Sequence, residues 1–372
     1  LAASPGTCVL QPALLTATAR TLLPDPSQAI ALPSHAPLAV TFRACAERTP
    51  HQIAVTQAGA SFTYAELARS SEQIARAVAV RAKHGEVVAV SGPRSFALVS
   101  SLLGVLQSGA VLLSLDPSLP RERKRVMLAQ AKATLLVAAG EAAADDLLEL
   151  PGLHVADSGT LTAGTPLTPC LPELRPEQPA YVFFTSGSTG VPKAVLGSQQ
   201  GLAHFLDWQR NEFQVQATDR ASQLTALSFD VVLRDMFLAL SSGATLCLPQ
   251  GTDVVDPTHI LHWLSQERVS ILHVVPSLAR LWLSCAPAGL SFPALRLVFF
   301  AGEPLSDVLV TRFRQVFGAQ VQVVNLYGPT ETTLAKCFAR VPTPAAAGVQ
   351  SIGGPLPQTQ VLILNRQRQL CG

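Results

Sequence analysis

The chain has 372 residues, of which 48% are hydrophobic and 14% are charged, and its formal net charge is +2. This composition excludes an intrinsically disordered protein, because there is ample apolar material for a large core. The near balance of acidic and basic residues argues against nucleic-acid binding through bulk charge. The cysteines include no C-x-x-C pair, which argues against a disulfide framework or a zinc site and favours the reducing cytoplasm.

Residues 1–38 are rich in Ala, Leu, Pro and Ser and are predicted to be a linker from a preceding domain, followed by one core over residues 39–372. The chain starts at Leu1 without the basic segment of a signal peptide, so we expect a piece of a longer protein. The uncharged stretch from Ser95 to Leu115 is long enough to cross a membrane. The Ser108-Gly109 pair divides it, so we predict a buried helix and a buried strand instead.

Short apolar segments alternate with helical patterns along the core. The predicted strands are 86–90, 110–115, 134–138, 181–184, 245–248, 270–275, 295–300 and 320–326. The predicted helices are 64–82, 96–107, 121–131, 201–213, 232–240, 257–267, 276–284 and 306–317. Residues 358–372 are predicted to form a further strand and a polar turn. This alternation predicts parallel sheets covered on both faces, with ligands at the carboxyl ends of the strands.

A glycine-rich loop is the sharpest chemical signal in the sequence. It runs from Thr185 to Lys193, directly after the apolar segment that ends at Phe184, and combines four hydroxyls, two glycines and a lysine. Glycines let the backbone approach a polyphosphate closely, hydroxyls donate hydrogen bonds, and lysine adds positive charge. The loop therefore predicts phosphate binding rather than a flexible surface turn. It is not a Walker loop, because Lys193 precedes Ala194 instead of a serine or threonine.

This loop and four further motifs, in order, resemble those of the adenylation domains of nonribosomal peptide synthetases, within the acyl-adenylate-forming superfamily. The further motifs are Phe62-Thr63-Tyr64-Ala65-Glu66-Leu67, the segment from Gln107 to Arg123, Phe229-Asp230, and Asn325-Leu326-Tyr327-Gly328-Pro329-Thr330-Glu331. Ala194 departs from the family, which has a glycine there. The resemblance implies an α/β fold with stacked, mostly parallel sheets flanked by helices, and a small β-rich subdomain toward the C-terminus. The ribose-binding aspartate and the C-terminal subdomain of the family would lie beyond Gly372.

The resemblance implies an enzyme that works in two steps. A carboxylate attacks the α-phosphate of ATP to give an acyl-adenylate and pyrophosphate, and the pantetheine thiol of a carrier protein then takes the acyl group. We therefore expect an AMP-forming ligase that uses ATP and Mg²⁺ and activates an amino acid for natural-product biosynthesis. Its expected partners are a carrier domain and neighbouring synthetase domains, with no nucleic acid and no membrane. The chain alone is expected to be a monomer and weakly active.

The resemblance also assigns residues to ATP and its metal ion. Thr185, Lys193 and Glu331 would be catalytic, and Glu331 and Thr189 would ligate Mg²⁺, a hard cation that prefers oxygen ligands. Tyr327 would stack on adenine and Thr330 would bond the α-phosphate. The whole set expected to hold ATP is Thr185, Ser186, Gly187, Ser188, Thr189, Gly190, Lys193, Gly302, Glu303, Asn325, Tyr327, Gly328, Thr330 and Glu331.

Asp230 is the residue expected to mark the substrate as an amino acid. A carboxylate at the end of an apolar segment is costly to bury without a cation, and an α-ammonium group supplies one. The alternative is an aspartate that caps the next helix. By the same resemblance, the residues that line the substrate pocket would be Phe229, Asp230, Val231, Arg234, His273, Phe299, Ala301, Leu326, Leu334 and Ala335.

Arg234 is the unusual member of this set, and it leaves the side chain of the substrate open. A guanidinium in an apolar pocket favours a substrate with a polar or carboxylate side chain. Alternatively, Arg234 turns to solvent or pairs with Asp235. Two other functions also remain open: an acyl-CoA or aryl-acid ligase of the same superfamily, and a core that binds nucleotide and amino acid without turnover.

Overall fold

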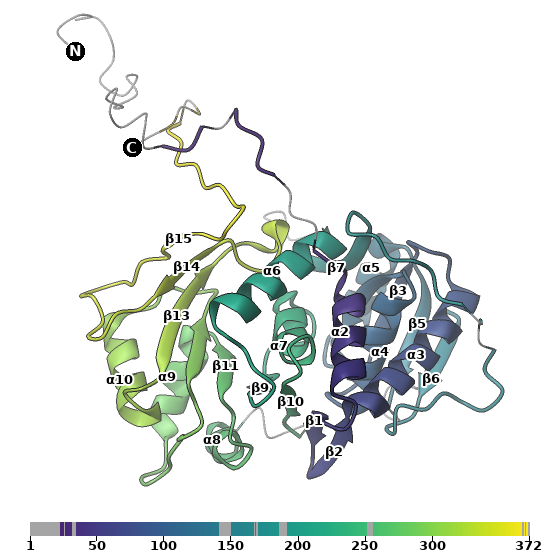
Figure 1. Cartoon of the computed structure of the whole chain (residues 1–372), viewed down its shortest axis with the longest axis horizontal. Coiled ribbons are helices and arrows are strands. Elements are labelled where there is room, and N and C mark those ends of the chain that lie inside the picture. The colour runs from purple at the N-terminus through teal and green to yellow at the C-terminus, as the bar shows by residue number, and fades with distance from the viewer. Residues whose placement is uncertain are drawn as a thin grey trace, which may run out of the picture. The chain divides into compact units, whose positions relative to one another are not determined.

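The computed structural model describes residues 23–25, 27–31, 35–140, 150–166, 168, 170–185, 192–250, 256–366, 368 and 370. The chain divides into two compact units, Ser34–Gly353 on the one hand and Leu1–Pro33 with Gly354–Gly372 on the other. The larger unit contains two β-sheets with helices packed on them (Figure 1). The smaller unit contains β15 (Gly354–Pro355).

The smaller sheet has the strand order β6-β5-β3-β4-β7-β8. The strands from β6 to β7 are parallel, and β8 returns antiparallel to β7. The bounds are β3 Val87–Ser91, β4 Val111–Leu115, β5 Ala133–Ala139, β6 Gly152–Val155, β7 Pro179–Thr185 and β8 Lys193–Ser198. The ends of the glycine-rich loop are therefore the ends of an antiparallel strand pair, in which Thr185 is directly opposite Lys193.

The larger sheet has the order β14-β13-β12-β11-β9-β10-β1-β2 within the larger unit. The strands from β13 to β1 are parallel, and antiparallel strands flank them at both sides. The bounds are β1 Ile53–Gln57, β2 Ala60–Thr63, β9 Arg220–Ser222, β10 Thr245–Leu248, β11 Ile271–Val274, β12 Leu297–Phe300, β13 Gln322–Tyr327 and β14 Cys337–Arg340. The carboxyl ends of β9, β11, β12 and β13 consequently meet at one edge of this sheet.

Helices cover both sheets. The bounds are α2 Leu38–Arg48, α3 Tyr64–Arg81, α4 Phe96–Gln107, α5 Arg121–Ala131, α6 Gln199–Glu212, α7 Val231–Leu240, α8 Pro257–Gln266, α9 Pro276–Cys285, α10 Asp307–Phe317 and the short η3 Thr330–Thr332. The α3–α4 pair lies between the sheets, because α3 contacts β1 and β2 whereas α4 contacts β3, β4 and β5. On the larger sheet, α8, α9 and α10 bury an apolar core that includes Trp282, Phe300 and Phe313 (Figure 1).

Local chemistry explains where several helices begin. The Thr63 hydroxyl accepts a hydrogen bond from the Glu66 backbone N–H, and the Glu66 carboxylate accepts one from the Thr63 backbone N–H, which forms a capping box on α3. Ser95, Ser198 and Ser306 cap α4, α6 and α10 in the same way through their hydroxyls. These caps fix where the four helices begin.

Most predicted elements are confirmed, and their ends agree within two residues. The predicted strand at 358–372 is wrong, because its described residues form only an isolated bridge between Leu364 and Leu370. Helix α2, the β1–β2 hairpin and strands β6, β8, β9 and β14 were not predicted. The uncharged stretch is the buried helix α4 followed by the buried strand β4, as expected. None of the described helices combines the length and apolar character that a membrane span requires.

The β7–β8 pair depends on a glycine, which gives a test of the fold. Gly197 pairs with Tyr181, and a Cβ atom at Gly197 would lie 2.0 Å from Cζ of the buried Tyr181 ring. We predict that Gly197→Ala lowers the free energy of unfolding by about 2 kcal/mol, because the buried ring has no room to move. Urea denaturation measures this change. Gly354→Ala is the control, since nothing lies within 4 Å of its added Cβ, and an equal loss in both variants would contradict the prediction.

Candidate functional site

A cavity of about 770 Å³ opens at the carboxyl ends of β9, β11, β12 and β13. Ligand sites in open α/β sheets form at this edge, because the loops that leave the strands diverge there. Predicted substrate residues that line the cavity are Phe229, Asp230, Val231, Arg234, His273, Ala301, Leu326, Leu334 and Ala335. Predicted ATP residues that line it are Gly302, Glu303, Asn325, Tyr327 and Gly328. One cavity therefore collects residues of both predicted sites, from several segments between Phe229 and Ala335.

Asp230 is buried in this cavity with an unused hydrogen-bonding group. It occupies the N-cap position of α7, yet its side chain makes no capping hydrogen bond. The side chain is 5% exposed, and among the described residues Oδ2 has no hydrogen-bond partner. Burial raises the pKa of Asp230, while Arg234, the Leu334 backbone N–H and the Thr330 hydroxyl favour its charged form. Asp230 is thus a carboxylate with one oxygen left for a ligand rather than a helix cap.

Arg234 lines the cavity and pairs with Asp235, as the alternative to a ligand contact predicted. Its Nε and Nη2 donate to Asp235 Oδ1 at 3.3 and 3.2 Å, and both residues are buried. The Thr225 hydroxyl donates to Asp235 Oδ2. Burial raises the pKa of Asp235, and the neighbouring Arg234 charge opposes that rise. Because the two bonds from Arg234 use only Nε and Nη2, its Nη1 edge has no recorded partner among the described residues.

His273 lies beside the buried Arg234–Asp235 pair and is uncharged. Burial, with a contribution from Arg234, holds the pKa of His273 well below its usual range. The Gln209 side-chain amide lies within hydrogen-bonding distance of His273 Nε2, at 2.9 Å, and His273 Nδ1 lies 3.4 Å from Asp235 Oδ1. Phe299 was predicted to line the pocket, but it is absent from the cavity wall. Its ring stacks on the His273 ring, with 4.8 Å between the ring centroids, and so helps to hold that ring in place.

The residues predicted to hold adenine also line this cavity, but they differ in exposure and in hydrogen bonding. Tyr327 is 54% exposed, so its ring is available as a stacking surface. Asn325 is buried, and its Nδ2 donates to the Ser351 carbonyl at 3.0 Å. The Glu303 carboxylate accepts from the Ser277 backbone N–H and hydroxyl at 2.9 and 2.5 Å. Asn325 and Glu303 thus shape the wall, whereas Tyr327 presents an open face.

The structure describes only part of the predicted phosphate and metal set. Residues 186–191 of the loop, including Ser186, Gly187, Ser188, Thr189 and Gly190, lie outside the described residues. Thr185 and Lys193 flank the loop, and Lys193 is exposed. Strand β8, which begins at Lys193, contacts η3, which contains Thr330 and the exposed Glu331. Pro329 and Leu334, on either side of η3, line the cavity, so η3 with its hydroxyls and the Glu331 carboxylate lies next to the cavity that contains Asp230.

The chemistry of these donors fits a metal ion that arrives with its nucleotide. Within the described part of the chain, no group of three or more His, Cys, Asp or Glu side chains is placed to hold a metal. Mg²⁺ is commonly bound by one or two carboxylates together with substrate phosphates. Glu331 is an exposed carboxylate of this kind, so it fits Mg²⁺ held jointly by the protein and ATP.

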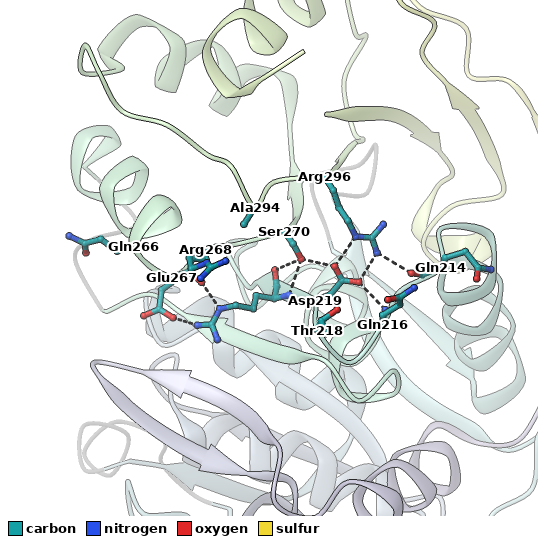
Figure 2. Close-up of a pocket in the computed structure, with 11 residues that line it drawn as sticks. Gln214, Gln216, Thr218, Asp219, Gln266, Glu267, Arg268, Ser270, Ala294 and Arg296 are labelled. Atoms are coloured by element: carbon teal, nitrogen blue, oxygen red, sulfur yellow. Dashed lines mark hydrogen bonds and ion pairs between the residues drawn. The ribbon is translucent and has the colours of Figure 1, made fainter. Parts of the chain in front are cut away.

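A second, polar pocket of about 640 Å³ lies at the opposite, amino ends of β9, β11 and β12 (Figure 2). Four of its charged groups form two pairs: Arg296 makes two bonds to Asp219 at 2.8 and 2.6 Å, and Arg220 pairs with Glu267. Ser270 donates to Asp219 at 2.7 Å. Burial would raise the pKa of Asp219, but these bonds hold it below its usual range. This pocket is a closed ion-pair network that joins the strand ends.

Thr225 and Gln209 were missed by the sequence analysis. Thr225 lines the cavity and bonds Asp235, and Gln209 lies in α6 and fixes His273. Neither residue belongs to a recognisable motif, since one precedes α7 in a loop and the other lies inside a helix. Only the tertiary structure brings them to the site.

Known proteins similar to this chain share its fold and parts of its sequence. The family described as AMP-binding enzyme matches residues 42–371. A subunit of plipastatin synthase from Bacillus subtilis (strain 168) is 35% identical over 332 residues, which are 88% of this chain and 9% of that protein. The L-2-aminoadipate reductase large subunit of Eremothecium gossypii is 30% identical in an alignment of 405 positions, gaps included, which covers 96% of this chain and 29% of that protein.

Among solved structures, the AMPPNP-bound form of the nonribosomal peptide synthetase FmoA3 has a TM-score of 0.82 and 28% sequence identity, covering 93% of this chain and 37% of that one. This likeness confirms the α/β fold predicted from the sequence. The chain spans less than half the length of each of these relatives.

The partnerless oxygen of Asp230 gives a pH-dependent prediction. Because burial raises the folded-state pKa of Asp230 above its unfolded value, its protonated form favours folding. The stability that this group contributes is present in acid and is lost as pH rises through the raised pKa. Asp230→Asn cannot lose a proton there. We therefore predict that, without ligand, the variant becomes more stable than wild type as pH rises, by on the order of 1 kcal/mol. Urea denaturation between pH 4 and 8 measures the difference, and a constant gap would contradict it.

Proposed function

Because the chain belongs to the family of AMP-binding enzymes, and its resemblance to adenylation domains of nonribosomal peptide synthetases is confirmed, we propose that it converts an amino acid and ATP into an aminoacyl-adenylate and pyrophosphate. The observation that carries this proposal is the buried Asp230 carboxylate, whose Oδ2 has no partner among the described residues of the cavity. A substrate ammonium group would supply both the missing hydrogen-bond donor and the missing positive charge.

The reaction needs positioning and charge neutralisation more than a strong base. One carboxylate oxygen of the amino acid forms a bond to the α-phosphorus of ATP, the bond between the α- and β-phosphates breaks, and pyrophosphate leaves. Both reactants are anions, so cationic groups must offset their repulsion. Lys193 and the Thr185 hydroxyl would bind the leaving phosphates, Thr330 would bind the α-phosphate, and Mg²⁺ held by Glu331 and Thr189 would neutralise the charge that develops.

The transfer of the aminoacyl group to a carrier domain is proposed from the relatives of the chain, not from the residues of the cavity. FmoA3 is a nonribosomal peptide synthetase by name, and this chain covers only a minor part of it and of the plipastatin synthase subunit. We propose that the aminoacyl group is then transferred to the pantetheine thiol of a carrier domain, with neighbouring synthetase domains as partners.

Arg234 supports a substrate whose side chain accepts hydrogen bonds. Asp235 engages Nε and Nη2, which leaves Nη1 as a further donor, and Arg234 lines the cavity that the side chain would enter. A carboxylate, hydroxyl or amide oxygen would satisfy this donor, whereas a large apolar group would leave it without a partner. A relative named for L-2-aminoadipate, which has a side-chain carboxylate, aligns with 96% of this chain. We propose an amino acid with an acidic or small polar side chain.

Removal of the Asp230 carboxylate tests the proposed function. We predict that Asp230→Ala weakens amino-acid binding by about 30-fold or more, as expected when one partner of a buried charge pair is lost, and leaves ATP–Mg²⁺ binding within twofold. Isothermal titration calorimetry with ATP–Mg²⁺ and a panel of L-amino acids measures both affinities.

Asp256→Ala is the matched control for this experiment. Asp256 is also a helix N-cap, but its carboxylate bonds the Thr258 and His259 backbone N–H groups and lies outside the cavity. We expect it to lower stability without changing amino-acid affinity. Wild type that binds an aryl or fatty acid instead of amino acids, or equal loss of ATP and amino-acid binding in Asp230→Ala, would reject the proposal.

A conservative change at Arg234 tests the side-chain preference. Arg234→Lys keeps the positive charge next to Asp235 but loses the planar fork that reaches both Asp235 and the cavity. We predict that the preference for L-glutamate, L-2-aminoadipate or L-serine over L-leucine falls by about tenfold, which corresponds to one charge-assisted hydrogen bond. The ratio of dissociation constants measures it. Tightest binding of L-leucine or L-phenylalanine by wild type would contradict the proposed preference.

A further inference from the structure

Arg94 reaches from the smaller sheet to the wall of the cavity. It lies three residues after the end of β3 and just before α4. Its Nε donates to Gln223 Oε1 at 2.7 Å, and its Nη2 donates to the carbonyls of Leu224 and Thr225 at 3.3 and 3.0 Å. Gln223 Nε2 also donates to the Thr225 carbonyl, at 2.5 Å. One side chain thus holds three consecutive residues of a segment that follows β9.

Asp116 holds the other end of the same segment. It follows β4, the neighbour of β3 in the smaller sheet, and its Oδ2 accepts from the Leu227 backbone N–H at 3.2 Å. The Ser118 backbone N–H and hydroxyl fix its Oδ1 at 2.9 and 2.6 Å. Burial would raise the pKa of Asp116, but these bonds and the nearby Arg94 charge hold it below its usual range, so it accepts as an anion.

The segment between these two contacts is part of the cavity. Leu224, Thr225 and Ala226 line it, and the Thr225 hydroxyl bonds Asp235, which in turn holds Arg234. The residues that line the cavity all lie between Leu224 and Ile352, so Arg94 itself is not part of the wall. Its effect on the cavity must pass through the backbone of 224–225 and the hydroxyl of Thr225.

We propose that Arg94, together with Asp116, is a positioning residue for the amino-acid pocket: it fixes the backbone of residues 223–227, and through Thr225 it sets the position of the Asp235–Arg234 pair. This inference rests on the proposed function, because it concerns the pocket for the substrate side chain. Among the described residues, the bonds of Arg94 and Asp116 to this segment involve none of those predicted to hold adenine and phosphate, at 185, 193, 302–303 and 325–331, so we expect nucleotide affinity to be independent of Arg94.

Two variants of Arg94 separate positioning from simple structural support. Arg94→Met removes all three hydrogen bonds, and Arg94→Lys keeps the charge and a single donor group. The expected result is amino-acid binding weakened at least tenfold in Arg94→Met and partly restored in Arg94→Lys, with ATP–Mg²⁺ binding within twofold in both. Calorimetry with L-serine, L-alanine, L-glutamate and L-2-aminoadipate measures these affinities. Hydrogen–deuterium exchange without ligand is expected to be faster over residues 223–236 in Arg94→Met.

Arg314→Met is the matched control. Arg314 also donates to two backbone carbonyls, those of Pro342 and Val341 at 2.7 and 2.9 Å, and neither of these residues lines the cavity. It should cost a similar amount of stability but change neither amino-acid affinity nor exchange over 223–236. The inference is overturned if Arg94→Met binds the amino acid within twofold of wild type, or if Arg314→Met weakens it equally. If wild type binds ATP–Mg²⁺ but no member of a full panel of L-amino acids, the proposed function is rejected and this inference with it.

Discussion

The site depends on a carboxylate that is buried before its partner arrives. An ion removed from water costs several kcal/mol unless other groups replace its hydration. Around Asp230, the Leu334 backbone N–H, the Thr330 hydroxyl and the charge on Arg234 replace part of it, and the amino end of α7 adds a favourable dipole. None of them meets Oδ2. Without ligand, the folded chain therefore carries the free-energy cost of an incompletely solvated carboxylate. A bound ammonium group would remove that cost, and this would favour the binding of an amino acid.

The charges inside the cavity narrow what can bind there. Arg234 and Asp235 neutralise each other, His273 is uncharged, and Asp230 leaves one negative charge. An amino acid with a neutral polar side chain brings one ammonium to this wall and leaves it balanced. Under the proposed function, an acidic side chain would instead place its carboxylate at Arg234 and would add a negative charge to this wall.

The sequence predicted those features of the fold that depend on residues close together in the chain. Hydroxyl caps, continuous apolar strands and the loop with Lys193 are encoded within a few residues, so the helices, the parallel sheets and the general place of the site followed from them. The sequence did not decide the partner of Arg234, because adjacent positions do not show whether its side chain turns to Asp235 or to the cavity. In the structure Arg234 bonds Asp235 and also lines the cavity. Phe299 and Thr225 show the limit: one supports His273 from behind and the other bonds Asp235, and both relations join distant parts of the chain.

The two ends of the larger sheet show why polarity alone does not make a ligand site. At the amino ends, Arg296 and Arg220 each face a carboxylate with complementary geometry, and these pairs satisfy one another. At the carboxyl ends, the charged groups do not all satisfy one another. Among the described residues, Asp230 Oδ2 has no hydrogen-bond partner, and Arg234 bonds Asp235 through Nε and Nη2 only. The smaller sheet contributes to this asymmetry, since Arg94 and Asp116 bind the segment at the carboxyl ends. A rigid wall that holds unsatisfied groups in place, rather than a polar pocket as such, is what a substrate can use.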